Sequence, residues 1–151
     1  MEYKKIGICT SSLGTGVTVV EPSNLYGCSL GDNVFIGPFV EIQTGVVIKK
    51  NSRVQSHSFL CEGVEIGEDC VIGHGVMFIN DTYSIGQPAN GNKDLWKPTE
   101  ISDRVFIGSN ATILPVSICS DVVIGAGSVV THNITKPGKY AGNPAREISD
   151  V

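Results

Sequence analysis

The sequence lacks several features that define whole classes of protein. Lysine and arginine number 11 against 15 aspartates and glutamates, which gives a net charge of −4. The chain therefore has no basic footprint for nucleic acid and no polybasic segment for a membrane surface. No apolar run approaches the length of a membrane span, and the first residues hold no apolar run of signal-peptide length. These absences predict a cytoplasmic protein with no nucleic-acid or membrane partner.

Paired cysteines and aromatic residues are scarce as well. The five cysteines are odd in number and form no CxxC pair, which argues against a disulfide framework and favours reduced thiols. Aromatic residues make up 7% of the chain while glycine is abundant at 18 residues, a balance that disfavours a conventional sandwich or a helical bundle. A length of 151 residues predicts one domain, residues 1–151, with a real core.

In place of these features the sequence has a six-residue period. All nine positions reached in steps of six are large and apolar: Leu30, Ile36, Ile42, Ile48, Val54, Leu60, Ile66, Ile72 and Phe78. At the overall apolar fraction, chance would produce such a run in about 3 of 10,000 trials. The residue four places after each is small or β-branched. Glycine often follows the large residue directly (Gly31, Gly37, Gly67, Gly73), which permits a positive φ at a corner.

A period of six fits neither a helix nor a simple strand. Three hexads make an 18-residue coil of three short strands, and the coils stack as a triangular prism that buries its apolar residues only against neighbouring coils. Leu30, Ile48 and Ile66 then stack on one side of the prism. The period returns at Ile101, which predicts about six coils, roughly 30 Å in height at 4.8 Å each. Residues 81–100 become one ejected loop, and a short C-terminal tail follows.

The hexads "LGDNVFIGPFVEI", "IGEDCVIGHGVMF" and "VFIGSNATILP" resemble those of the hexapeptide-repeat acyltransferases. The resemblance covers residues 13–148 and implies an all-β, left-handed parallel β-helix, an exception to the right-handed crossover rule. Within that family, "CEGVEIGEDCVIGHGVMFINDTY" and "NATILPVSICSDVVIGAGSVVT" are similar to bacterial N-acetyltransferases that act on nucleotide-linked amino sugars. The resemblance implies direct acetyl transfer from acetyl-CoA to the amine of a nucleotide-linked deoxy-amino sugar, in a homotrimer.

The candidate residues for the acceptor side lie around the broken coil. His74, two residues past Ile72 at a corner, has the side chain best suited to accept a proton near neutral pH, and the resemblance makes it the candidate base. Asn80 stands where relatives carry a substrate-contacting asparagine. The remaining candidates for acceptor binding are His57, one coil earlier beneath Gly75, Glu62 and Tyr83. Direct transfer with the CoA sulfur as final proton acceptor, and purely structural roles for His57 and Asn80, remain alternatives.

The candidate residues for the acetyl-CoA side lie further along the chain. Gly108 and Ala126 follow corner isoleucines in successive coils, where small residues would let a pantetheine arm lie against the backbone. Polar and positive residues near the C-terminus are the candidates for the CoA phosphates: Thr131, Lys136, Lys139 and Arg146. An ordinary solvated tail is the competing interpretation of this positive group.

Three other functions fit the same fold. A zinc carbonic anhydrase would need three histidines around one metal, and the three in this chain lack the H-x4-H spacing, so no metal is expected. A non-catalytic trimeric scaffold would have no need to interrupt its stacking with a loop. O-acetylation of a sugar or another small acceptor is the closest alternative, although its histidine–proline pair is missing from this loop. The sequence leaves open which sugar is used and whether its nucleotide is dTDP or UDP.

Overall fold

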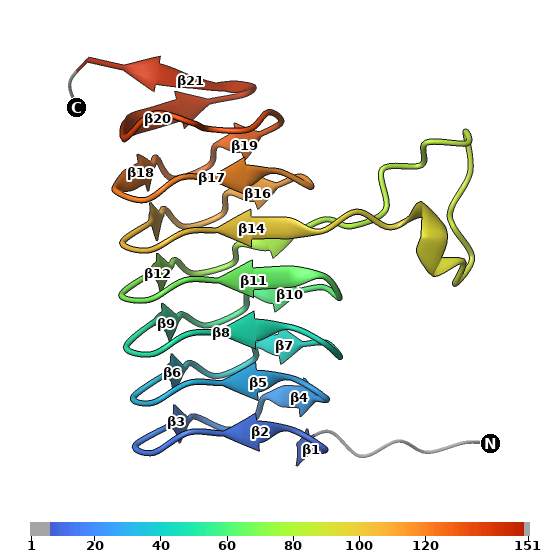
Figure 1. Cartoon of the computed structure of the whole chain (residues 1–151), viewed down its shortest axis with the longest axis vertical. Coiled ribbons are helices and arrows are strands. Elements are labelled where there is room, and N and C mark those ends of the chain that lie inside the picture. Colours follow the sequence, from blue (N-terminus) through green and yellow to red (C-terminus); the bar gives the residue numbers. More distant parts are fainter. Residues whose placement is uncertain (1–6, 150–151) are drawn as a thin grey trace.

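A computed structural model describes residues 7–149, and they form a left-handed β-solenoid of three parallel sheets (Figure 1). The first sheet runs β1-β4-β7-β10-β13-β16-β19, so the chain makes about seven turns. The sequence predicted about six, because the first coil carries an incomplete apolar pattern. Its Ile8 and Leu13 are 46% and 44% exposed, since no earlier coil covers them.

The strands are two to five residues long. The first sheet contains β1 (Ile8–Cys9), β4 (Asn24–Tyr26), β7 (Glu41–Ile42), β10 (Phe59–Leu60), β13 (Met77–Phe78), β16 (Thr112–Ile113) and β19 (Val129–Val130). The second contains β2 (Ser12–Leu13), β5 (Ser29–Leu30), β8 (Val47–Ile48), β11 (Val64–Ile66), β14 (Thr99–Ile101) and β17 (Ser117–Ile118). The third contains β3 (Thr18–Val19), β6 (Phe35–Ile36), β9 (Arg53–Val54), β12 (Val71–Ile72), β15 (Phe106–Ile107), β18 (Val122–Ile124), β20 (Gly138–Gly142) and β21 (Ala145–Ile148).

The core confirms the hexad register. Ile66 is fully buried and pairs with Ile48 in the coil before it and Ile101 in the coil after it. The small residues between the large ones are buried as well, including two serines. Ser58 donates its hydroxyl to the carbonyl of Gly73 at 2.8 Å and accepts the amide of Val76 at 3.2 Å. A buried serine is tolerated at this position because both of its hydrogen-bonding functions are satisfied by the next coil.

The explanation proposed for the glycines at positions 31, 37, 67 and 73, a positive φ, is wrong. None of these four has a positive φ; that conformation falls two residues later, for example at Asn33 and Gly75. The four glycines are needed because the next coil passes too close for a side chain. A Cβ on Gly73 would lie 2.7 Å from the carbonyl oxygen of Ile107, closer than non-bonded atoms approach.

The ejected loop and the tail also differ from expectation. The loop occupies residues 79–98, because Thr99 and Glu100 already belong to β14. It contains the one helical turn of the described residues, η1 (Lys93–Leu95), and projects away from the prism (Figure 1). The tail is a hairpin in which β20 extends the third sheet parallel to β18 and β21 returns antiparallel. Within residues 7–149 no helix is long and apolar enough to cross a membrane.

Candidate active site

The corners of successive coils form three long edges of the prism. The edge between the third and first sheets carries His74, just after β12, and we call it the His74 edge. The edge between the first and second sheets releases residues 79–98 and is called the loop edge. The third edge carries ion pairs between neighbouring coils, such as Arg104–Asp121 at 2.7 Å, and is called the charged edge. Residues on different edges of one chain do not meet across the packed core.

His74 is held by the coils on both sides of it. Its Nδ1 lies 2.9 Å from the hydroxyl oxygen of Ser56 in the preceding coil. In the following coil, Ser109 accepts its backbone amide at 3.2 Å, and its carbonyl accepts the amide of Asn110 at 2.7 Å. When the serine hydroxyl accepts a hydrogen bond from Nδ1–H, Nε2 becomes the basic nitrogen of the ring. This exposed histidine therefore has a fixed backbone and an oriented imidazole.

Ser56 is a functional candidate that sequence reasoning missed. It occurs 18 residues before His74, which is one full coil. In a solenoid of this pitch, residues 18 apart are spatial neighbours on the same edge. Adding that interval to each polar corner residue would have found the pair from the sequence.

His57 lies where the register predicted, one coil below Gly75 and next to the Ser56–His74 pair. Gly108 and Ala126 occupy the same edge, one and two coils above His74. The small size of Gly108 has a packing cause, because its Cβ would lie 2.4 Å from the backbone nitrogen of Ala126. That space is filled by the next coil rather than open to a ligand. A role for Gly108 and Ala126 in binding the donor remains a prediction.

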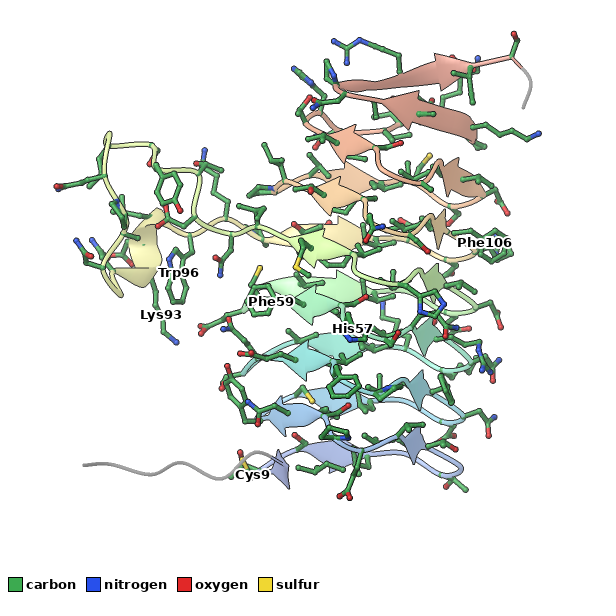
Figure 2. The ribbon with its side chains drawn as sticks, turned by 180° about the vertical axis from the view of Figure 1, so that it is seen from behind. Cys9, His57, Phe59, Lys93, Trp96 and Phe106 are labelled. Atoms are coloured by element: carbon green, nitrogen blue, oxygen red, sulfur yellow. The ribbon has the colours of Figure 1, made fainter. Side chains whose placement is uncertain are left out.

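On the loop edge, Asn80 and Glu62 are brought together. The Asn80 side-chain amide donates to the backbone carbonyl of Glu62 at 3.0 Å. The Glu62 carboxylate accepts two hydrogen bonds from Lys93 Nζ, each 2.7 Å long, and Lys93 also lies 5.8 Å from the ring centroid of Trp96. Figure 2 shows Lys93 and Trp96 on the projecting loop and His57 on the body of the prism. Tyr83 lies in the same loop with a side chain that is 60% exposed.

His74 and Asn80 are not brought together within one chain. They flank β13, so they lie on two different edges. Six extended residues span at most about 20 Å, and the strand between them holds the two corners apart. One acceptor amine cannot touch both side chains of the same chain. The projecting loop leaves from the loop edge, one side of the prism away from His74.

The positive residues near the C-terminus are also divided. Lys136 precedes β20 and pairs with Glu147 at 2.9 Å, and this carboxylate raises the pKa of Lys136. Arg146 pairs with Ala141, one step nearer the turn of the hairpin than Glu147, and Ala141 packs over Gly125 at the top of the His74 edge. Thr131 lies on the loop edge, with its hydroxyl 2.8 Å from His132 Nδ1. Lys139 lies within β20, beside Val123 of the third sheet. Of the predicted phosphate ligands, Arg146 is therefore the one placed above His74.

Cysteine chemistry does not contribute to this arrangement. All five cysteines are free thiols, as the sequence predicted. Cys61, next to Glu62, is buried, and burial raises the pKa of its thiol to about 11. It is therefore protonated near neutral pH and unsuited to act as a nucleophile. Among residues 7–149, no group of three or more histidine, cysteine, aspartate or glutamate side chains is placed to hold a metal ion.

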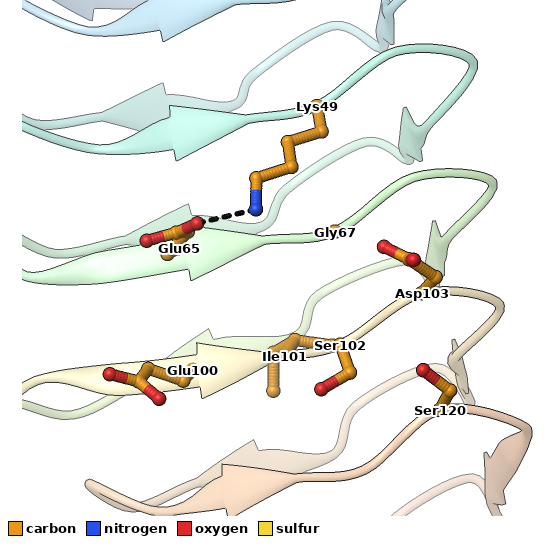
Figure 3. Close-up of a pocket in the computed structure, with 8 residues that line it drawn as sticks. All are labelled: Lys49, Glu65, Gly67, Glu100, Ile101, Ser102, Asp103 and Ser120. Carbon is orange, nitrogen blue, oxygen red and sulfur yellow. Dashed lines mark ion pairs between the residues drawn. The ribbon is translucent and has the colours of Figure 1, made fainter.

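A cavity of about 410 Å³ lies elsewhere, on the outer face of the second sheet (Figure 3). Its charged lining consists of Glu65, Glu100 and Asp103 with Lys49, which is already paired with Glu65 at 2.7 Å. None of the predicted site residues lines it. An excess of carboxylates repels phosphates, so this cavity does not suit either of the expected substrates.

Two family models match the repeats. One, described as the hexapeptide repeat of succinyl-transferase, matches residues 56–77 and 98–132. The other, described as the bacterial transferase hexapeptide (six repeats), matches residues 27–62. The chain belongs to the hexapeptide-repeat transferase family.

A curated relative agrees with this assignment, and solved structures share the fold. The bifunctional protein GlmU of Thermotoga petrophila is 30% identical over 135 residues, which cover 84% of this chain and 30% of that protein. The chain thus spans about a third of the length of such relatives. AntD, an N-acyltransferase from Bacillus cereus, was solved as a variant with dTDP-4-amino-4,6-dideoxyglucose and coenzyme A. That complex superposes with a TM-score of 0.79 at 24% identity, over 92% of this chain and 82% of its own. A hexapeptide-repeat containing acetyltransferase from Vibrio cholerae gives a TM-score of 0.61 at 25% identity, over 91% and 72% of the two chains.

Proposed function

We propose that this protein is an acetyl-CoA-dependent N-acetyltransferase that acts on the amino group of a nucleotide-linked deoxy-amino sugar. The observation that carries the proposal is the Ser56–His74 hydrogen bond of 2.9 Å on an exposed edge. It supplies an oriented base, and Arg146 stands above it as a ligand for the phosphates of CoA. The fold shared with AntD, whose complexes contain an amino sugar linked to dTDP and coenzyme A, supports this choice of substrates.

The proposed reaction is a direct transfer. The neutral amine attacks the carbonyl carbon of the acetyl thioester, a C–N bond forms, and the C–S bond breaks to release the CoA thiolate. His74 Nε2 takes the proton lost by the amine, and that proton then passes to the sulfur, which leaves as the free thiol. A base with a suitable proton affinity contributes about 10²–10⁴-fold, and the alignment of the two substrates on one edge contributes much of the rest.

A complete acceptor pocket requires a second copy of the chain, in this proposal a homotrimer. Asn80 and the projecting loop are separated from His74 within one chain, but the loop extends far from its own prism (Figure 1). A neighbouring copy would place the loop and Asn80 of one subunit against the His74 edge of the next. We expect three equivalent sites. Sedimentation that shows a stable monomer at micromolar concentration would refute this assembly.

The activity is tested by incubating the protein with acetyl-CoA and a panel of dTDP- and UDP-linked amino sugars. Released CoA thiol is followed against a blank without acceptor, because the exposed Cys9 also reacts with thiol reagents. Mass spectrometry should show one acetyl group added to the amino sugar. Acetylation of matched sugars that carry a hydroxyl in place of the amine would instead identify an O-acetyltransferase. Absence of transfer to every acceptor would overturn the proposal.

A further inference from the structure

Two aromatic residues on the His74 edge have a backbone conformation that costs energy. Phe39 and His57 have φ values of +60° and +64°, in the left-handed region, which histidine enters more often than other residues but a bulky phenylalanine rarely does. The same turn position in later coils is occupied by Gly75, Asn110 and Gly127, which tolerate it well. The strain therefore comes with the aromatic side chains, not with the fold as such.

Burial does not compensate for this strain. Phe39 remains 56% exposed, so its ring contributes little to the core. Instead it stacks on the His57 ring, with centroids 4.8 Å apart and planes inclined by 26°. Strained residues that are not required for packing are most often retained at ligand sites. The outer face of the stack is thus a candidate binding surface.

The stack borders a hollow of about 330 Å³. Its lining is Pro22, Ser23, Asn24, Phe39, Val40 and Glu41. The backbone amide of Phe39 hydrogen-bonds to the carbonyl of Pro22 in the coil below. The hollow therefore forms a shallow slot along these two adjoining coils, lined by Pro22 and by Phe39 as its aromatic wall, while Asn24 and Glu41 supply polar groups. Such a slot suits a flat ring with hydrogen-bonding groups on its edge.

The position of Phe39 along the His74 edge indicates which planar ligand would bind there. The candidate residues for acetyl-CoA lie above His74, so an acceptor reaches His74 from below. Phe39 lies two coils beneath His74, about 10 Å at roughly 4.8 Å per coil, a separation that a nucleoside diphosphate can bridge. We propose that Phe39, stacked on His57, binds the planar base of the acceptor nucleotide in the slot with Pro22. This inference rests on the proposed function and adds where the nucleotide binds.

The test measures binding of dTDP and of UDP, without acetyl-CoA, by calorimetry. Loss of one base–aromatic stack should weaken the better-bound nucleotide by about 5- to 150-fold in Phe39→Ala, while Phe39→Tyr should bind like the parent. Phe106→Ala is the matched control, because Phe106 is also an exposed aromatic, 46% accessible, on the outer face of the third sheet. Inorganic pyrophosphate, which has no base, should bind all four proteins equally.

A second variant separates binding from folding. Phe39→Gly removes both the ring and the strain, so it should melt no lower than the parent and yet bind nucleotide as weakly as Phe39→Ala. The inference would be overturned if Phe39→Ala bound nucleotide with parental affinity. It would also be overturned if that variant lost the oligomer, because the Phe39 ring would then be a contact between subunits. If the parent itself binds neither nucleotide, the proposed acceptor class fails instead, and the two failures are distinguishable.

Discussion

Replacement of His74 by alanine tests the proposed chemistry most directly. If Nε2 accepts the amine proton, His74→Ala should lower kcat by about 10²–10⁴-fold. The KM for acetyl-CoA should change little, because the histidine meets the amine and the donor residues lie above it. Ser56→Ala should be milder. It removes one hydrogen bond to the ring, worth about 0.5–1.5 kcal/mol, and should lower kcat by about 2- to 13-fold.

Steady-state kinetics with an amino-sugar nucleotide would measure these effects, with His132→Ala as the matched control. His132 is an exposed histidine on the loop edge, and its replacement should leave kcat close to the parental value. Asn80→Ala should mainly raise the KM of the acceptor. Should Asn80→Ala be the crippling change while His74→Ala costs less than tenfold, positioning dominates and the CoA sulfur accepts the proton. The catalytic role of the Ser56–His74 pair would then be refuted.

Three further predictions concern stability. Ile66→Asp places an unpaired charge between coils and should lower the free energy of unfolding, measured by urea titration, by roughly 4 kcal/mol. Val123→Asp, at an exposed position, should lower it by under about 1 kcal/mol. Equal losses would contradict the hexad register. Gly108→Ala should lower the free energy of unfolding in the same titrations by about 1–3 kcal/mol, because its Cβ would meet backbone at 2.4 Å. A parental value would contradict this close approach of the next coil. Burial raises the pKa of the Cys61 thiol from 9.0 to about 11, so the folded chain keeps a proton that the unfolded chain loses. Stability should therefore fall between pH 9 and pH 11 by at most about 3 kcal/mol, and Cys61→Ala should flatten that decline.

Much of the fold was predictable because a solenoid repeats one local rule. The hexad positions from Leu30 to Phe78 are all buried, and the pairing of Ile66 with Ile48 and Ile101 follows from the period of 18 and the ejected loop. The predictions about the fold failed where a coil has no neighbour on one side and where the backbones of two coils approach closely. The first coil lacks a partner below, so its pattern is weak. Gly73 is glycine because another coil passes 2.7 Å from its Cβ position, a distance that no pattern of residues discloses.

The candidate site was likewise predictable from the sequence only in part. The sequence by itself determined that a histidine stands at a corner next to a break in the repeat, because residue type and period can be read from the chain. The tertiary structure added the hydrogen bond by which Ser56 orients His74, the hydrogen bond from Asn80 to the Glu62 carbonyl, and the hairpin that places Arg146 beside Ala141. It also decided that Phe39 stacks on His57. These facts depend on side-chain contacts between coils. The six-residue period assigns residues to edges but carries no record of which side chains bond to one another.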